Sequence, residues 1–285
     1  MTDSNKQSRV LVNVLGIPLL LSAIYFGGIF FQCLIFIAIF MSTFELYSMC
    51  LKKDIEIQII PLFLFFIYLF FTHFLESISM NMGILFFLVI LILSLEVFRK
   101  KNKPIENIAI TIFALIWIGL FMNCIVLIRN MLIQGTLQQE FLPLGMYLTL
   151  IMFISVWTCD STAFLFGSKF GKSKILPNIS PNKTWVGTIA GIVSVFILLS
   201  FSYYLLNHPL DYNKYHFLHI IILSFVFGGV GQIGDFIESM IKRQFEVKDS
   251  GTSLRGHGGF LDRMDSLILV APSFYLYLKY VGIIG

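Results

Sequence analysis

Charged residues are scarce in this chain. Among its 285 residues only 13% are charged, whereas 57% are hydrophobic and 16% are aromatic. A soluble domain of this length carries about twice that charged share, and the mean hydropathy here is +0.86. The composition therefore excludes a water-soluble enzyme and a large domain outside a membrane.

The strict alternation of polar and apolar residues that is typical of outer-membrane barrel strands is missing as well. The apolar runs are continuous instead, as in residues 59–71. Because a spanning helix needs roughly 20 apolar residues, the sequence predicts an all-α, polytopic integral membrane protein with about nine transmembrane helices. The expected spans are residues 10–26, 29–48, 59–74, 82–98, 108–128, 144–159, 186–206, 217–233 and 267–284.

Cysteine is also rare, and its pattern excludes two further classes of site. The 4 cysteines form no CxxC pair, and no histidine lies at ligand spacing from them, so neither a zinc site nor a disulfide framework is indicated. The net charge of +4 would suggest nucleic-acid binding in a soluble protein. In a membrane protein it indicates basic cytoplasmic loops, and we expect no nucleic-acid partner.

The basic residues give the predicted topology an orientation. Alternate loops place 17 of the 20 lysines and arginines on one side and 3 on the other. Since cytoplasmic loops carry the positive excess, the N-terminus is expected in the cytoplasm and the C-terminus on the opposite side of a bacterial-type inner membrane.

Two long polar stretches, residues 159–187 and 234–266, are both assigned to the cytoplasmic side. They lie in the second of two expected regions: an N-terminal region of five spans, residues 1–143, and a catalytic region of four spans, residues 144–285. The active site is therefore predicted on the cytoplasmic side.

The second polar stretch concentrates groups that bind metals and phosphates. Asp235, Ser239 and Lys242 are spaced so that they share one face of a helix, and Asp262 and Asp265 follow where the last span begins. Carboxylates among phosphate-binding cations are explained by a hard divalent cation that binds carboxylate oxygens and substrate phosphates together. This pattern predicts phosphoryl or nucleotidyl transfer, and the alternative is an ionic network that caps two helices.

A glycine-rich segment, residues 250–259, lies between these acidic groups. Its backbone amides can approach phosphate oxygens closely. Cationic side chains surround it in the sequence, namely Lys242, Arg243, Lys248, Arg255 and Arg263.

Both polar stretches carry a family pattern. In one it consists of Ser239, Lys242, Arg243, Lys248, Asp249, Gly251, His257, Gly258, Gly259, Asp262, Arg263 and Asp265, and in the other of Asp160, Gly167, Gly171, Lys172, Ser180, Pro181, Lys183, Thr184, Trp185 and Gly187. The pattern closely resembles the signature of the CDP-diacylglycerol synthase, or phosphatidate cytidylyltransferase, family. The chain departs from it at Arg255, where the family usually has Pro or Gly, and at Val186, where Glu is common.

The resemblance implies an enzyme that makes CDP-diacylglycerol and pyrophosphate from phosphatidate and CTP in membrane phospholipid synthesis, with Mg²⁺ as cofactor. Asp235 and Asp262 are the expected metal ligands, by resemblance and by placement. Lys242, Arg263 and Asp262 are expected to be catalytic. The expected substrate-binding residues are Asp160, Ser180, Lys183, Thr184, Ser239, Arg243, Lys248, Asp249, His257 and Asp265.

In the first polar stretch, Ser180, Lys183 and Thr184 precede a predicted helix, whose N-terminus attracts anions. We expect them to contact nucleotide phosphates, although Lys183 and Trp185 could simply anchor the chain at the membrane interface. Two other functions stay open: a different CTP-dependent lipid enzyme, such as a lipid kinase, and a transporter with buried charges. The need for a second cation and the homodimer expected by analogy with relatives also stay open.

Overall fold

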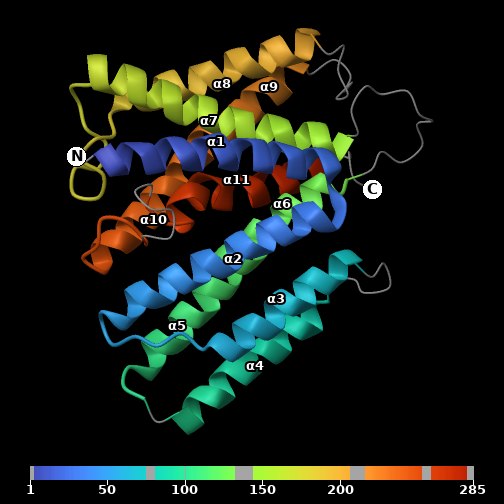
Figure 1. Cartoon of the computed structure of the whole chain (residues 1–285), viewed down its shortest axis with the longest axis vertical. Helices are drawn as coiled ribbons and strands as arrows, with labels where there is room; N and C mark the ends of the chain where they lie inside the picture. The colour runs from blue at the N-terminus through green and yellow to red at the C-terminus, as the bar shows by residue number, and fades with distance from the viewer. Residues whose placement is uncertain are drawn as a thin grey trace. The chain divides into compact units, whose positions relative to one another are not determined.

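A computed structural model describes residues 3–74, 81–99, 101–131, 144–205, 216–251 and 258–280. Within these ranges the regular structure is helical, and the only strand-like pairing is one isolated antiparallel bridge between Lys174 and Thr184. The predicted all-α class is therefore confirmed (Figure 1).

Long helices account for most of the described residues. They are α1 (Asp3–Phe26), α2 (Gly28–Leu51), α3 (Ile59–Phe74), α4 (Met82–Arg99), α5 (Pro104–Ala114), α6 (Phe121–Arg129), α7 (Leu144–Phe170), α8 (Trp185–Leu205), α9 (His216–Ser224), α10 (Gly231–Gln244) and α11 (Leu261–Tyr280). Two π-helical segments, η1 (Leu115–Leu120) and η3 (Phe225–Val230), join α5 to α6 and α9 to α10 without a break. In the described part of the chain, each predicted apolar span thus lies in one helix or in one continuous series of helices.

Six of these helical stretches are long and apolar enough to cross a membrane. They are Gly28–Leu51, Met82–Arg99, Pro104–Arg129, Leu144–Phe170, Trp185–Leu205 and Phe217–Gln244. Two more apolar stretches, Val14–Phe26 and Ile59–His73, are shorter. The chain is therefore a helical membrane protein, and the crossing of all nine predicted spans stays a prediction.

The sharp turn between α1 and α2 depends on glycine. Gly27 and Gly28 have φ angles of 63° and 53°, which a residue with a Cβ adopts only at a cost. These two residues let one apolar helix follow another almost directly, which agrees with the short connection between the predicted spans 10–26 and 29–48.

The chain forms two compact units that interleave along the sequence. The first combines residues 1–126 with 244–263, and the second combines residues 127–243 with 264–285. The predicted division into an N-terminal region, residues 1–143, and a catalytic region, residues 144–285, is a division by function, and it stays a prediction. The second polar stretch, residues 234–266, continues beyond α10. Its residues 244–263 belong to the first unit, together with the N-terminal helices.

In the first unit, α2, α3, α4 and α5 pack as neighbours (Figure 1). A buried carboxylate, Glu96 of α4, organises one end of this group. It accepts hydrogen bonds from Gln58 Nε2 at 2.7 Å, Asn107 Nδ2 at 2.7 Å and Arg99 Nη1 at 3.1 Å. Because a buried carboxylate is tolerated only when it is paired and hydrogen-bonded, this network fixes the turns that precede α3 and α5.

In the second unit, α7 and α8 lie side by side (Figure 1), and small residues set their separation. A Cβ added at Gly187 would lie 2.6 Å from the carbonyl oxygen of Ala163, and one at Gly171 would lie 2.3 Å from Thr184 Oγ1. These glycines belong to the family pattern, and helix packing accounts for them. The close approach fixes the ordered loop between the two helices, residues 171–184.

Candidate active site

The last turns of helix α10 carry two pairs of interacting polar side chains. The hydroxyl of Ser239 donates to Asp235 Oδ1 at 3.2 Å, and Lys242 Nζ lies 2.5 Å from Glu238 Oε2. Glu238 is fully buried, and Lys242 is only 9% exposed. The spacing of four residues brings each pair together on the helix surface, as predicted for Asp235, Ser239 and Lys242.

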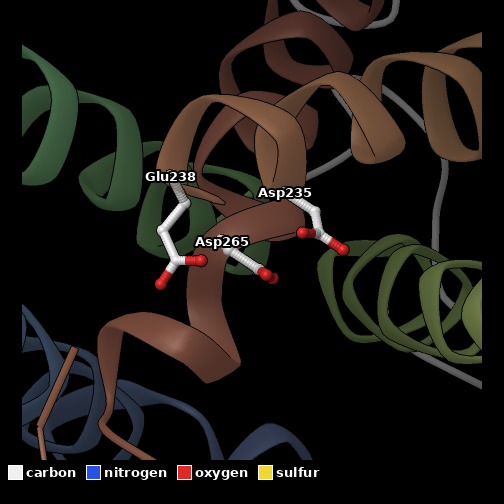
Figure 2. A group of neighbouring side chains, drawn as sticks. All are labelled: Asp235, Glu238 and Asp265. Atoms are coloured by element: carbon white, nitrogen blue, oxygen red, sulfur yellow. The ribbon is translucent and has the colours of Figure 1, made fainter. Parts of the chain in front are cut away.

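Three carboxylates converge where α10 meets α11. One oxygen of each of Asp235, Glu238 and Asp265 lies within 4.8 Å of the others, and Figure 2 shows the Asp265 side chain between those of Glu238 and Asp235. Gly234 permits this meeting, since a Cβ there would lie 2.5 Å from the carbonyl oxygen of Asp265. The acidic cluster therefore depends on a close contact between the two helices.

A lysine from the loop before α8 completes this cluster. Lys183 Nζ lies 2.5 Å from Asp235 Oδ2 and 4.7 Å from the centre of the Phe236 ring. Asp160 of α7 interacts electrostatically with both Lys183 and Asp235. The structure thus brings together Asp160, Lys183 and Asp235, three residues that the sequence places far apart.

Carboxylates outnumber lysines in this cluster of described residues. Asp160, Asp235, Glu238 and Asp265 supply four carboxylates, and Lys183 and Lys242 supply two ammonium groups. A divalent cation would interact favourably with these carboxylates. Carboxylate oxygens are the ligands that Mg²⁺ prefers, and the three converging carboxylates are a group that could hold such an ion.

Thr184 has a structural task at the start of α8. It is buried, and its Oγ1 accepts a hydrogen bond from the N–H of Gly187 at 3.2 Å, which is the usual arrangement of a helix cap. The Ser180 carbonyl accepts the N–H of Lys183 at 3.3 Å, and Arg243 Nε donates to the Ile179 carbonyl at 3.4 Å. The cap and this turn hold Lys183 beside Asp235, while nucleotide contact by Ser180, Thr184 and Arg243 stays a prediction.

The remaining predicted residues lie in the first unit. Lys248, Asp249 and Arg263 are exposed. Asp262, in the first turn of α11, accepts the N–H of Gly259 at 2.7 Å and that of Ser250 at 3.0 Å through Oδ2.

The acidic cluster contains Asp235 but not Asp262, and the role of Asp262 as a metal ligand stays a prediction. His257, like Arg255, lies outside the described residues.

Two buried acids that contact signature residues, Glu238 and Glu45, are not among the site residues expected from the sequence. Glu238 lies three residues after Asp235 and four before Lys242, so its helical spacing was a usable signal. Glu45 is a single acid within the predicted span 29–48. An ionisable residue inside an apolar span is itself a reason to expect function.

These features define a class: helical membrane proteins with a site of clustered carboxylates and lysines, which is suited to phosphoryl or nucleotidyl transfer. Within that class, the chain belongs to the cytidylyltransferase family, whose model matches residues 7–281. The family resemblance expected from the signature residues is confirmed.

Several curated relatives are similar to this chain. Phosphatidate cytidylyltransferase of Bacillus subtilis is 32% identical over 276 residues, which cover 95% of this chain and 97% of the relative. The proteins of the same name from Haemophilus influenzae and Staphylococcus aureus strain COL are 39% and 42% identical over 137 and 135 residues. Those shorter matches cover 48% and 47% of this chain and 47% and 50% of the two relatives.

Proposed function

We propose that this protein is a phosphatidate cytidylyltransferase, which converts phosphatidate and CTP to CDP-diacylglycerol and pyrophosphate. The similarity to the Bacillus subtilis enzyme along nearly the whole of both chains carries the proposal. The cluster of acids and lysines on α10, α11 and the loop before α8 supports it independently, because it has the chemistry that the reaction requires.

The reaction joins two polyanions. A phosphate oxygen of phosphatidate attacks the α-phosphorus of CTP, a new P–O bond forms, and the bond to the β-phosphate breaks as pyrophosphate leaves. The attacking phosphate is already ionised near neutral pH, so no strong base is needed. The protein must instead neutralise and orient phosphates, and we assign that work to Lys183, Lys242, Arg243, Lys248 and Arg263.

Asp235, Glu238 and Asp265 would hold Mg²⁺, with Asp262 as the further ligand that the family pattern implies. When bound, the ion would polarise phosphate oxygens and offset their developing charge. The ammonium groups of Lys183 and Lys242 hold the Asp235 and Glu238 carboxylates in place. Ser239 orients Asp235 through its hydroxyl.

The topology that we propose has nine spans, with the N-terminus and the catalytic site on the cytoplasmic side of the inner membrane and the C-terminus outside. The uneven distribution of lysine and arginine supports it. A homodimer and a second cation are further parts of the proposal that rest on the family alone.

Cysteine labelling tests this topology. In a variant without the 4 native cysteines, Asn102→Cys and Ser173→Cys are expected to react with an impermeant maleimide only after the cytoplasmic face is opened. Tyr212→Cys is expected to react in intact cells. If Ser173→Cys and Tyr212→Cys were labelled from the same side, the span between them would be wrong.

The activity is tested with purified protein, phosphatidate, Mg²⁺ and CTP labelled at the α-phosphate. We expect the label to appear in a lipid, and pyrophosphate to be released in equal amount. CTP labelled at the γ-phosphate is the matched control, because only a lipid kinase would transfer that label. Folded protein that labels no lipid from either nucleotide would contradict an enzyme function and favour the transporter alternative.

A further inference from the structure

One buried acid of the first unit reaches the signature segment from an N-terminal helix. Glu45 lies in α2 and is only 2% exposed. Its carboxylate accepts hydrogen bonds from Ser250 Oγ at 2.8 Å, from Phe260 N at 2.9 Å and from Leu261 N at 3.0 Å. The partners lie 205 to 216 positions later in the chain, so these contacts join an apparently generic apolar helix to the family pattern.

Two of these hydrogen bonds cap a helix. Leu261 is the first residue of α11 and Phe260 precedes it, so their N–H groups have no partner inside the helix. A carboxylate beside such N–H groups also interacts favourably with the helix dipole. Glu45 therefore caps α11 from another helix, and through Ser250 it also binds the chain before residues 252–257.

Two signature glycines make room for this carboxylate. A Cβ at Gly251 would lie 2.7 Å from Glu45 Oε1, and one at Gly259 would lie 2.1 Å from Glu45 Oε2. No real Cβ approaches another atom so closely. The absence of a side chain at Gly251 is explained by contact with Glu45, and at Gly259 by contact with Glu45 and with the Ser250 hydroxyl, independently of any contact with phosphate.

The same residues also hold Asp262. Ser250 N and Gly259 N donate to Asp262 Oδ2 at 3.0 and 2.7 Å. The Ser250 hydroxyl lies between the two acids, 2.8 Å from Glu45 Oε2 and 3.1 Å from Asp262 Oδ2. The place of the Asp262 carboxylate is thus set by residues that Glu45 itself holds.

We propose that Glu45 is a positioning residue for the reaction: it fixes the first turn of α11 and both ends of the glycine-rich segment, and thereby the Asp262 carboxylate. The proposal rests on the proposed function, in which Asp262 takes part. It also gives the N-terminal helices a task in catalysis beyond crossing the membrane.

Glu45→Gln is the informative variant, because the amide keeps the size of the side chain but only one of its two terminal atoms still accepts hydrogen bonds. We expect kcat per folded molecule to fall by about 10-fold or more, since small displacements of positioning groups cost up to about 100-fold. We also expect a higher Mg²⁺ concentration for half-maximal rate. A residue that only supported the fold would lower the yield and the melting temperature and leave both constants unchanged.

Glu96→Gln is the matched control. Glu96 is also a buried, hydrogen-bonded glutamate of the first unit, but its hydrogen bonds come from Gln58, Asn107 and Arg99. We expect this variant to melt at a lower temperature and to keep the kcat and the Mg²⁺ requirement of the unaltered protein.

Hydrogen exchange gives a readout that does not depend on activity. In Glu45→Gln the amides of Ser250, Phe260 and Leu261 are expected to exchange faster, whereas Glu96→Gln leaves them unchanged. The steric contact is tested separately: Gly251→Ala is expected to destabilise the protein, and much less so when Glu45→Ala removes the atoms that its Cβ would meet.

The outcomes separate this proposal from the proposed function. Unaltered kcat, Mg²⁺ requirement and exchange in Glu45→Gln, with an active parent protein, would overturn the role of Glu45 and leave the function intact. An inactive parent protein would overturn the function. In that case hydrogen exchange in Glu45→Gln, and the stability of Gly251→Ala with and without Glu45→Ala, would show whether Glu45 fixes the segment. Unchanged hydrogen exchange would refute that structural role as well.

Discussion

Asp235→Asn is expected to remove almost all formation of CDP-diacylglycerol while the protein stays folded. Asparagine keeps the size of the side chain and removes the charge that pairs with Lys183. If Asp235 is a ligand of the metal, the loss of several kcal/mol of transition-state stabilisation corresponds to about a thousandfold in rate. The rate of lipid labelling from α-labelled CTP, measured against Mg²⁺ concentration, gives the result.

Asp54→Asn is a suitable control for that experiment, because Asp54 is an exposed aspartate in the turn after α2. Its φ of 56° is one that asparagine adopts readily. The control is expected to match the parent protein in rate and in melting temperature. An Asp235→Asn variant that matched it at every Mg²⁺ concentration would show that the acidic cluster is not the metal site.

Local patterns predicted the helices well, because each depends on residues close together in the sequence. For that reason the predicted span 29–48 ends close to the end of α2 at Leu51, and the predicted span 59–74 begins with α3 at Ile59. The ends were less accurate where polar residues continue a helix: the span predicted to end at residue 159 lies in α7, which continues to Phe170. Hydropathy marks where a segment leaves the membrane, whereas hydrogen bonding determines where the helix ends.

The candidate site was predictable only in part. The shared face of Asp235, Ser239 and Lys242 follows from helical spacing, which the sequence contains. The meeting of Asp235 with Asp265 depends on how closely α10 and α11 approach at Gly234. No local pattern contains that distance.

The contacts of Glu45 were not predictable from local patterns either, because the residues that it binds are even farther away in the sequence. Its partners lie more than 200 positions away, so only the folded chain identifies them. The sequence predicts phosphate contact for the glycine-rich segment, and it contains no signal of the contact that Gly251 and Gly259 make with Glu45.

The roles of Asp262 and Asp265 can be separated by their asparagine variants. Asp265 is one of three crowded carboxylates, and burial together with repulsion from Asp235 raises the pKa of its carboxyl group. We therefore expect Asp265→Asn to lose most activity and to need at least about 10-fold more Mg²⁺, while its melting temperature stays the same or rises.

Asp262→Asn is expected to lose activity and stability together. Asp262 Oδ2 accepts two backbone N–H groups at the start of α11, and removing a carboxylate from a helix N-terminus costs about 0.3–1 kcal/mol. Its melting temperature is therefore expected to fall, and faster hydrogen exchange is expected at Ser250 and Gly259. If Asp262 is also a metal ligand, Asp262→Asn is expected to need more Mg²⁺ than the parent protein, as Asp265→Asn does. A loss of stability with an unchanged Mg²⁺ requirement would assign the metal to Asp235, Glu238 and Asp265, and would leave Asp262 to hold the glycine-rich segment.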